Sequence, residues 1–265
     1  MVTGTGEEEL LRRAGVQLDV HGAVATVTLN RPEVKNAQTP ATWAALAAVG
    51  QGLAPEVRVV VLRGAGDSFS SGLDRRLLTP EGVVGERSML ELMRAPEDEL
   101  DATIAGYQEG FTWLRRGDLV SIAAVQGHAI GAGFQLALAC DLRVLADDAQ
   151  LSIREPLLGL VPDLTGTKPL VELVGYSRAL EICATGRVVE AGEAYDLGLA
   201  TAVVPRGELD AAVADLVAAL TAPAHGAVSE TKALLQTAAA LDLDEQRRAE
   251  RAAQVRRFRE LSGRA

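Results

Sequence analysis

The sequence predicts an α/β fold in which strands alternating with helices form a core and helices make up the C-terminal part. Two segments, VRVVVLRG (57–64) and LVSIAAVQG (119–127), are nearly continuous apolar runs, which is typical of strands buried on both faces. From about residue 166 onward the apolar spacing is helical. Alternation of strands and helices, followed by helices alone, favours an α/β core with a helical extension.

The N-terminal elements are predicted from turn and capping residues. Apolar and polar residues alternate over 16–30 around His21 and Gly22, which indicates a β-hairpin. Thr39 and Pro40 are typical of an N-cap and the first position of a helix, so a helix is expected to follow them.

The later elements are predicted from shorter patterns. Strands are expected at 141–146 and 149–153, whereas 79–100 has the weakest periodicity and receives no element. Helices are expected in KPLVELVG, SRALEICATG, EAGEAYDLG, ELDAAVADLVAAL, GAVSETKALLQTAAA and the charged final segment.

Composition excludes several classes of protein. The chain has 265 residues, of which 48% are hydrophobic, and a net charge of −10, which argues against binding to nucleic acid or to anionic membranes. No signal sequence or run of membrane-spanning length is visible, so a cytoplasmic location is expected. Cys140 and Cys183 lie in apolar contexts without a partner at metal-ligand spacing, so they are predicted to be buried thiols and no metal site is expected.

Two of the predicted strands run into glycine-containing turns, at 63–74 and 126–135. A helix that begins after such a turn has unpaired N–H groups and partial positive charge. Two such starts facing each other could hold one oxygen atom, as in an oxyanion hole for a carbonyl that becomes an enolate. A nucleotide phosphate site is the competing interpretation, but its fingerprint needs glycine where Phe69 or Gln135 stands. A third interpretation is that both segments are ordinary tight turns without a ligand.

Five segments together resemble the enoyl-CoA hydratase/isomerase family, the crotonase superfamily, over about residues 16–240. They are LNRPEVKNA (29–37), FSSGLD (69–74), AAVQGHAIGAGFQLALACDLR (123–143), REPLLGLVPDLTGT (154–167) and ATGRVVEAGEAYDLGLATAVVP (184–205). The resemblance implies a crotonase-like spiral of ββα turns with the acyl-CoA site over 1–200 and a helical trimerisation region over 201–265. It also implies acyl-CoA thioester substrates, a homotrimer or dimer of trimers, and no separate cofactor, since coenzyme A is part of the substrate.

The resemblance implies which backbone groups hold the enolate oxygen. They are the N–H of Leu73, which follows Gly72, and the N–H of Ala132, which follows Gly131. Alanine fits this position because only its N–H is required.

The resemblance also implies substrate-binding residues around the first turn. Lys35 and Ala37 would lie beside the CoA moiety, where Lys35 would supply positive charge to a phosphate or ribose. An ordinary surface lysine is the alternative. Ser71 and Asp74 flank the first donor, and Asp74 is alternatively an acid favoured in the first turn of a helix.

Hydratases that this chain resembles usually carry two glutamates twenty residues apart, and here the two positions hold Gln135 and Glu155. An amide cannot titrate, but it can orient a water or hold a neighbouring carboxyl. Asp163 stands where dienoyl-CoA isomerases of the family have an aspartate, although it could instead cap a helix after Pro162. A structural ion pair with Arg154 or a distant arginine is the alternative for Glu155.

The preferred function is double-bond isomerisation of enoyl- or dienoyl-CoA, with Glu155 as acid and base and Asp163 assisting. A single carboxylate in an apolar pocket, here supplied by 157–161, can move a proton between two carbons. One alternative is a hydratase that uses Glu155 and a water positioned by Gln135. Another is a non-catalytic acyl-CoA-binding protein, against which the retention of Glu155 counts.

Four remaining features receive structural interpretations. His128 is expected to pack or line a pocket rather than to act as a catalyst, and Tyr107 and Trp113 to pack in the core or cover the acyl pocket. The segment 79–100 is expected to shape that pocket. Proteins that this chain resembles often have a C-terminal tail that covers the CoA, and Phe258 with the arginines near it could take the place of that tail.

Overall fold

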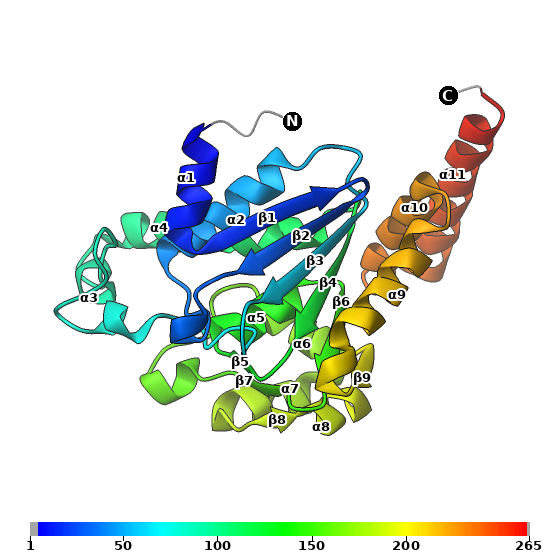
Figure 1. The fold of residues 1–265 in the computed structure, drawn as a ribbon. Helices are drawn as coiled ribbons and strands as arrows, with labels where there is room; N and C mark the ends of the chain where they lie inside the picture. Colours follow the sequence, from blue (N-terminus) through cyan, green and yellow to red (C-terminus); the bar gives the residue numbers. More distant parts are fainter. Residues whose placement is uncertain (1–4, 264–265) are drawn as a thin grey trace.

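A computed structural model of the protein describes residues 5–263. Its strands form a six-stranded sheet in the order β1-β2-β3-β4-β6-β9 and a three-stranded sheet in the order β5-β7-β8 (Figure 1). The strands are β1 (Val16–His21), β2 (Val24–Leu29), β3 (Val59–Gly64), β4 (Val120–Val125), β5 (His128–Ile130), β6 (Leu142–Ala146), β7 (Gln150–Ser152), β8 (Val189–Glu190) and β9 (Ala202–Val204).

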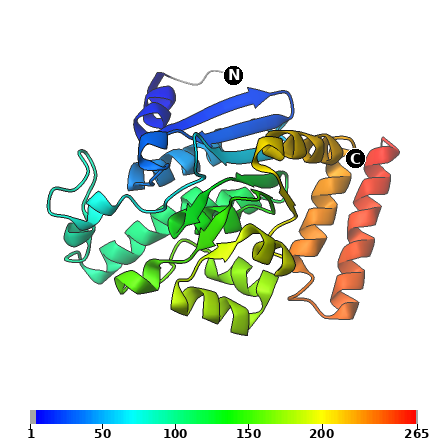
Figure 2. The same ribbon diagram turned by 60° about the horizontal axis from the view of Figure 1, so that its bottom comes forward.

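The helices surround these sheets (Figures 1 and 2). The α-helices are α1 (Thr5–Ala14), α2 (Pro40–Gly52), α3 (Met89–Leu92), α4 (Glu97–Thr112), α5 (Ala132–Ala139), α6 (Thr167–Val174), α7 (Tyr176–Thr185), α8 (Ala191–Asp196), α9 (Leu209–Thr221), α10 (His225–Thr237) and α11 (Leu243–Leu261). The 3₁₀-helices are η1 (Pro32–Val34), η2 (Arg75–Leu78), η3 (Trp113–Arg115), η4 (Glu155–Leu158) and η5 (Arg206–Glu208).

The larger sheet has buried side chains on both faces, as the apolar runs predicted. Val60 and Leu62 of β3 pack into the main core, whereas Val59 and Val61 face a second cluster that includes side chains of α9. Because successive strand residues point to opposite faces, a strand covered on both sides needs apolar residues at every position. In the larger sheet, β2, β3, β4, β6 and β9 follow one another in that order, and each neighbouring pair of them is parallel.

The predicted hairpin and first helix are confirmed. β1 and β2 pair antiparallel, and Gly22 in their turn has a φ of 59°, a left-handed conformation that favours glycine. The side chain of Thr39 accepts a hydrogen bond from the N–H of Thr42 in a capping box, and Pro40 is the first residue of α2. The strands expected at 141–146 and 149–153 are β6 and β7.

Four features differ from the sequence expectation. The segment 79–100, which received no element, contains α3 and the beginning of α4. The second glycine turn does not lead straight from β4 into a helix, because the short strand β5 intervenes and pairs with β7. The first turn leads into the four-residue 3₁₀-helix η2 rather than an α-helix. β9 belongs to the larger sheet although it follows residue 200, so the division of the chain at that residue stays a prediction.

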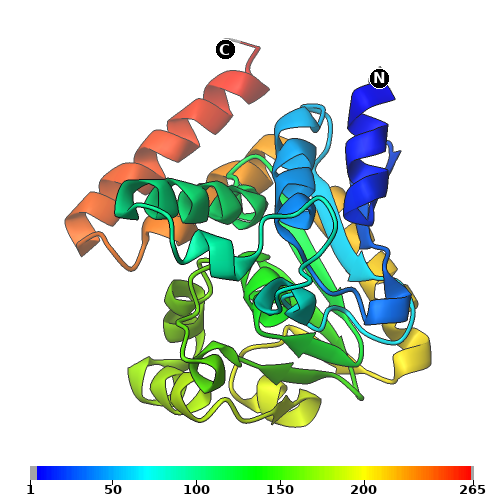
Figure 3. The ribbon, with the colours of Figure 1, turned by 90° about the vertical axis from the view of Figure 1, so that its left-hand side faces the viewer.

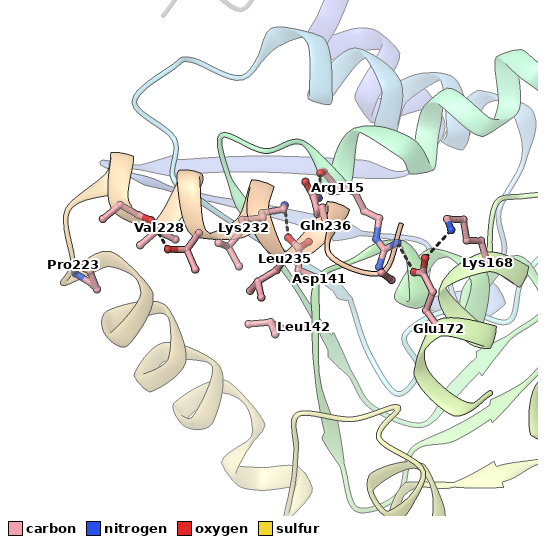
Figure 4. A pocket seen from close by; sticks show the side chains of 14 residues that line it. Arg115, Asp141, Leu142, Lys168, Glu172, Pro223, Val228, Lys232, Leu235 and Gln236 are labelled. Carbon is pink, nitrogen blue, oxygen red and sulfur yellow. Dashed lines mark hydrogen bonds and ion pairs between the residues drawn. The ribbon is translucent and has the colours of Figure 1, made fainter. Parts of the chain in front are cut away.

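The C-terminal helices extend along one side of the molecule, with α10 and α11 next to each other (Figures 1 and 2). Among the described residues of α10, only Lys232 is buried, and its Nζ donates to Leu119 O and to Asp141 Oδ2, both at 2.7 Å. A hollow of about 790 Å³ lies between α10 and the body of the protein, and Lys232, Asp141, Arg115, Lys168 and Glu172 are among the residues that line it (Figure 4).

No single helix of the described chain is long and apolar enough to cross a membrane. The bent pair Arg206–Thr221 and His225–Thr237, with an angle of 101° between its halves, passes this test by length and composition together.

Candidate active site

The two glycine turns lie against each other. Ser70 N donates to His128 O at 2.8 Å and Ile130 N donates to Ser70 O at 3.0 Å, which pairs the first turn with β5. Gly72 has a φ of 83°, and a Cβ there would lie 2.3 Å from Ile130 O and 3.3 Å from Ala132 N. This close approach requires glycine and brings Leu73 and Ala132 to the same place.

Both predicted donor N–H groups are free to meet a ligand. Gln38 N donates to Gly72 O and Asp74 N donates to Gln38 O, so the N–H of Leu73, which lies between them, points to the opposite side of the chain. Ala132 is the first residue of α5, where N–H groups lack intrahelical partners. Within the described residues, neither N–H has a hydrogen-bond partner.

A cavity of about 280 Å³ is lined by Leu73 and Ala132 and by the two predicted carboxyl residues, Glu155 and Asp163. Its walls come from α2, α3, α4 and the segment 155–164, and Figure 3 shows the side of the molecule on which α3 lies. The lining residues are Trp43, Leu73, Met89, Leu92, Met93, Leu100, Ile104, Tyr107, Ala132, Glu155, Leu160, Val161, Asp163 and Leu164. Residues of 79–100 thus line this cavity, and that it holds the acyl group stays a prediction.

Glu155 stands beside the second turn, because a Cβ on Gly131 would lie 3.2 Å from Glu155 Oε1. That oxygen accepts a hydrogen bond of 2.7 Å from Gln135 Nε2, whereas Glu155 Oε2 is buried without a partner among the described residues. Glu155 forms no ion pair with any described residue, so the structure does not support the alternative of a structural pair with Arg154.

Both carboxyls in the cavity have environments that favour the protonated form. Burial raises the pKa of Glu155, although the hydrogen bond from Gln135 acts in the opposite direction. Burial also raises the pKa of Asp163. Asp163 does not cap a helix, since α6 begins at Thr167 with Gly166 as its N-cap. Two carboxyls of raised pKa in the lining of an otherwise apolar cavity are suited to proton transfer.

The remaining predicted binding residues lie beside the first turn rather than in the cavity. Lys35 is exposed, and its carbonyl oxygen accepts a hydrogen bond of 2.8 Å from Ser71 N, while Ser71 Oγ donates to Val34 O at 3.2 Å. Ala37 is buried, and its carbonyl oxygen accepts a hydrogen bond of 2.9 Å from Arg31 Nη1.

Asp74 is held in place by protein groups. Its carboxylate accepts hydrogen bonds from Arg31 Nη2 at 3.1 Å and from Arg76 Nη2 at 2.7 Å, and it caps η2 through Arg76 N at 3.2 Å. The hydrogen bonds with Arg76 lower the pKa of Asp74 to about 2. The geometry therefore matches the alternative interpretation of a capping acid.

A buried polar chain supports the first donor and could not be predicted from the sequence. Trp43 Nε1 donates to Gln38 Oε1 at 2.8 Å, and Gln38 Nε2 donates to Ser70 Oγ at 2.9 Å. Ser70 Oγ donates to Asn36 O at 2.8 Å and accepts from Gly72 N at 3.2 Å. Gln38 and Ser70 are fully buried, so this chain fixes the backbone immediately before Leu73.

Several other residues lie outside the cavity. His128 Nδ1 is 3.0 Å from Ser68 Oγ, and Trp113 packs against Gly50 in the core. Phe258 is exposed on α11 and does not line the cavity. Cys140 is fully buried, as predicted, and burial raises its pKa to about 12.

The prediction for Cys183 was only half right, because this side chain is half-buried. Its place on α7 leaves it partly open to solvent.

Known proteins share this fold and sequence pattern. A family model described as enoyl-CoA hydratase/isomerase matches residues 19–264. The peroxisomal Delta(3,5)-Delta(2,4)-dienoyl-CoA isomerase of Arabidopsis thaliana is 32% identical over 225 residues, which cover 83% of this chain and 80% of that protein. The (E)-benzylidenesuccinyl-CoA hydratase of Thauera aromatica is 33% identical over 71% of this chain and 69% of that protein.

Solved structures of related proteins have the same fold as this chain. A Thermobifida fusca YX protein, provisionally named an enoyl-CoA hydratase and solved in complex with CoA, is 53% identical and superposes with a TM-score of 0.92 over 96% of this chain and 97% of that chain. A complex with acetoacetyl-CoA, described in the same way, gives 54% identity and a TM-score of 0.92 over 95% and 98% of the two chains. The chain has the crotonase fold, and it belongs to the enoyl-CoA hydratase/isomerase family of enzymes.

Proposed function

We propose that the protein isomerises the double bond of an enoyl- or dienoyl-CoA, with Glu155 as acid and base. One observation carries this proposal: the carboxyl beside the two donor N–H groups has an amide, Gln135, as its neighbour where related hydratases use a second glutamate. A reaction that needs one proton-transferring group suits this arrangement better than one that needs two.

The proposed reaction moves one proton between two carbons of the substrate. The carboxylate of Glu155 removes a proton from C2 of a 3-enoyl thioester, and the electron pair delocalises onto the thioester oxygen. The N–H groups of Leu73 and Ala132 donate to that oxygen and stabilise the dienolate. Glu155 then returns the proton at C4, and a double bond between C2 and C3 results. The apolar cavity walls keep water away from the dienolate.

Hydration of a 2-enoyl-CoA is the second candidate, because Asp163 lines the same cavity with a raised pKa. In that reaction Asp163 would supply the second acid–base group that Gln135 cannot provide. Binding of an acyl-CoA without turnover is the third candidate.

The substrate carries its own coenzyme A, and we propose no further cofactor. Lys35, exposed beside the first turn, would meet the CoA moiety, and Ala37, Ser71 and Asp74 would shape the adjoining backbone. The CoA and acetoacetyl-CoA complexes of the Thermobifida fusca protein support an acyl-CoA ligand. A homotrimer or dimer of trimers and a cytoplasmic location complete the proposal.

The test compares two reactions of the same protein. The unmodified enzyme is incubated with 3-enoyl-, 3,5-dienoyl- and trans-2-enoyl-CoA, and products are identified by mass and ultraviolet absorbance. We expect double-bond migration, and we expect Glu155→Gln to lose at least ~100-fold in kcat/KM. Fast hydration without migration would instead establish the hydratase. Acyl-CoA binding without either reaction would establish a binding protein.

A further inference from the structure

The side chain of Gln135 is occupied at both ends. Its Nε2 donates to Glu155 Oε1 at 2.7 Å, and its Oε1 accepts from the N–H of Leu164 at 2.9 Å and of Gly166 at 3.3 Å. Because both N–H groups can only donate, the amide oxygen must face them and the NH₂ group must face the carboxylate. Gln135 is fully buried and does not line the cavity, so it does not face a site for substrate water.

The turn held by Gln135 is strained. Thr165, between the two donating residues, has a φ of 67°, which is unfavourable for a β-branched side chain. Such a conformation persists only where the surroundings enforce it. Gly166 allows Gln135 to lie close, since a Cβ there would be 2.7 Å from Gln135 Cγ. The same turn begins at Asp163, the second carboxyl of the cavity.

We propose that Gln135 is a positioning residue that fixes Glu155 through its NH₂ group and the Asp163-bearing turn through its carbonyl oxygen, so that one amide sets both carboxyls of the cavity. This inference rests on the proposed function only in assigning proton transfer to Glu155. Because Gln135 donates to Glu155 Oε1, Glu155 Oε2 is the carboxylate oxygen without a partner among the described residues. This oxygen takes the proton that the substrate loses.

Glutamine meets both demands with one neutral side chain. An ionised glutamate could accept from Leu164 and Gly166, but it would place a second negative charge at Glu155 Oε1. Methionine has similar length but can neither donate to Glu155 nor accept from the turn. Asparagine is shorter by one methylene. The departure from the two-glutamate pattern therefore supplies Glu155 with a hydrogen-bond donor that does not itself titrate.

The test measures the titration of Glu155 directly. The side-chain carboxyl of Glu155 is followed by ¹³C NMR against pH in the unmodified protein and in Gln135→Met, with the signal assigned through Glu155→Gln. We expect the pKa of Glu155 to rise in Gln135→Met, since a hydrogen bond to the charged form is lost. The acidic limb of kcat/KM should move to higher pH with it, for whichever of migration and hydration the enzyme catalyses.

The turn provides a second readout. In Gln135→Met the amide hydrogens of Leu164 and Gly166 should exchange about tenfold faster, because each loses its acceptor. Adding Thr165→Gly should restore part of the thermal stability, since glycine accepts a positive φ, but should leave the pKa of Glu155 raised.

Gln126→Met is the matched control. Gln126 is also a buried amide, but its Nε2 donates to Gly64 O at 2.7 Å and to Gly66 O at 3.1 Å, away from Glu155. This variant should lose stability and keep the Glu155 titration unchanged. An unchanged Glu155 titration in folded Gln135→Met, or equal shifts in both variants, would overturn the inference. A shifted titration in a protein that does not migrate double bonds would overturn only the isomerase assignment.

Discussion

Gly72→Ala should disable the proposed oxyanion hole without touching a carboxyl. The added Cβ would lie 2.3 Å from Ile130 O, where real contacts are at least 3.0 Å, and 3.3 Å from Ala132 N. Both neighbours are backbone, so the two turns must move apart, and the donors Leu73 and Ala132 move with them. Loss of one such donor typically costs about 100- to 1,000-fold in kcat, or about 2.7–4 kcal/mol.

A second cost of Gly72→Ala is conformational and can be measured separately. Alanine at a φ of 83° is disfavoured by roughly 1–2 kcal/mol, which lowers stability whether or not the turns separate. Gly22→Ala isolates this cost, because Gly22 has a φ of 59° and a Cβ there would meet nothing within 4 Å. Both variants should lose thermal stability, and only Gly72→Ala should lose activity.

The assay is kcat/KM on the substrate that the unmodified enzyme turns over fastest, together with the oligomeric state by light scattering. A folded Gly72→Ala variant with the same oligomeric state and with kcat/KM within about threefold of the unmodified enzyme would refute the placement of the two donors. Loss of activity in Gly22→Ala as well would assign the effect to stability rather than to the site.

Three further predictions follow from the same geometry. Ala132→Pro removes a donor N–H and should abolish turnover, whereas Ala132→Gly should be mild; equal kcat values would contradict the assignment. Asp74→Asn should lower the free energy of unfolding by roughly 1–2 kcal/mol at pH 7. The pKa of this carboxylate is depressed to about 2, so it stabilises the fold above its unfolded pKa and loses this effect as the pH falls from about 4 toward 2. Denaturant unfolding should therefore show a smaller difference in stability between the two proteins at pH 3 than at pH 7. Lys35→Ala should weaken CoA binding and flatten its salt dependence in calorimetry, and an unchanged salt dependence would remove Lys35 from the CoA site.

Much of the fold could be predicted because its signals are local. The hairpin around Gly22 and the cap at Thr39 depend on a few adjacent residues, and both occur as expected. β5 and β8 could not be predicted, since strands of three and two residues exist only through pairing with β7. Such pairing joins segments far apart in the sequence and leaves no periodic pattern.

The candidate site also divides into residues that the sequence could predict and contacts that it could not. The motif positions of Leu73, Ala132 and Glu155 bring these residues to one cavity, as the resemblance implied. The partners of Gln135 and the positive φ of Thr165 could not be predicted, because they depend on where residues 164–166 pack. Residue type alone does not report which backbone groups a buried amide will meet.

The hydrogen-bonded chain from Trp43 to Gly72 has a consequence for how acyl groups are discriminated. The ring of Trp43 forms part of the cavity wall, with Tyr107 4.8 Å away between ring centroids, while its Nε1 begins the chain that ends at the first oxyanion turn. Under the proposed function, an acyl chain that presses on this wall would also act on the turn at which negative charge develops. Contacts between the acyl chain and this wall would then stabilise the transition state more than the bound substrate. Substrates with truncated acyl groups should therefore lower kcat more than they raise KM.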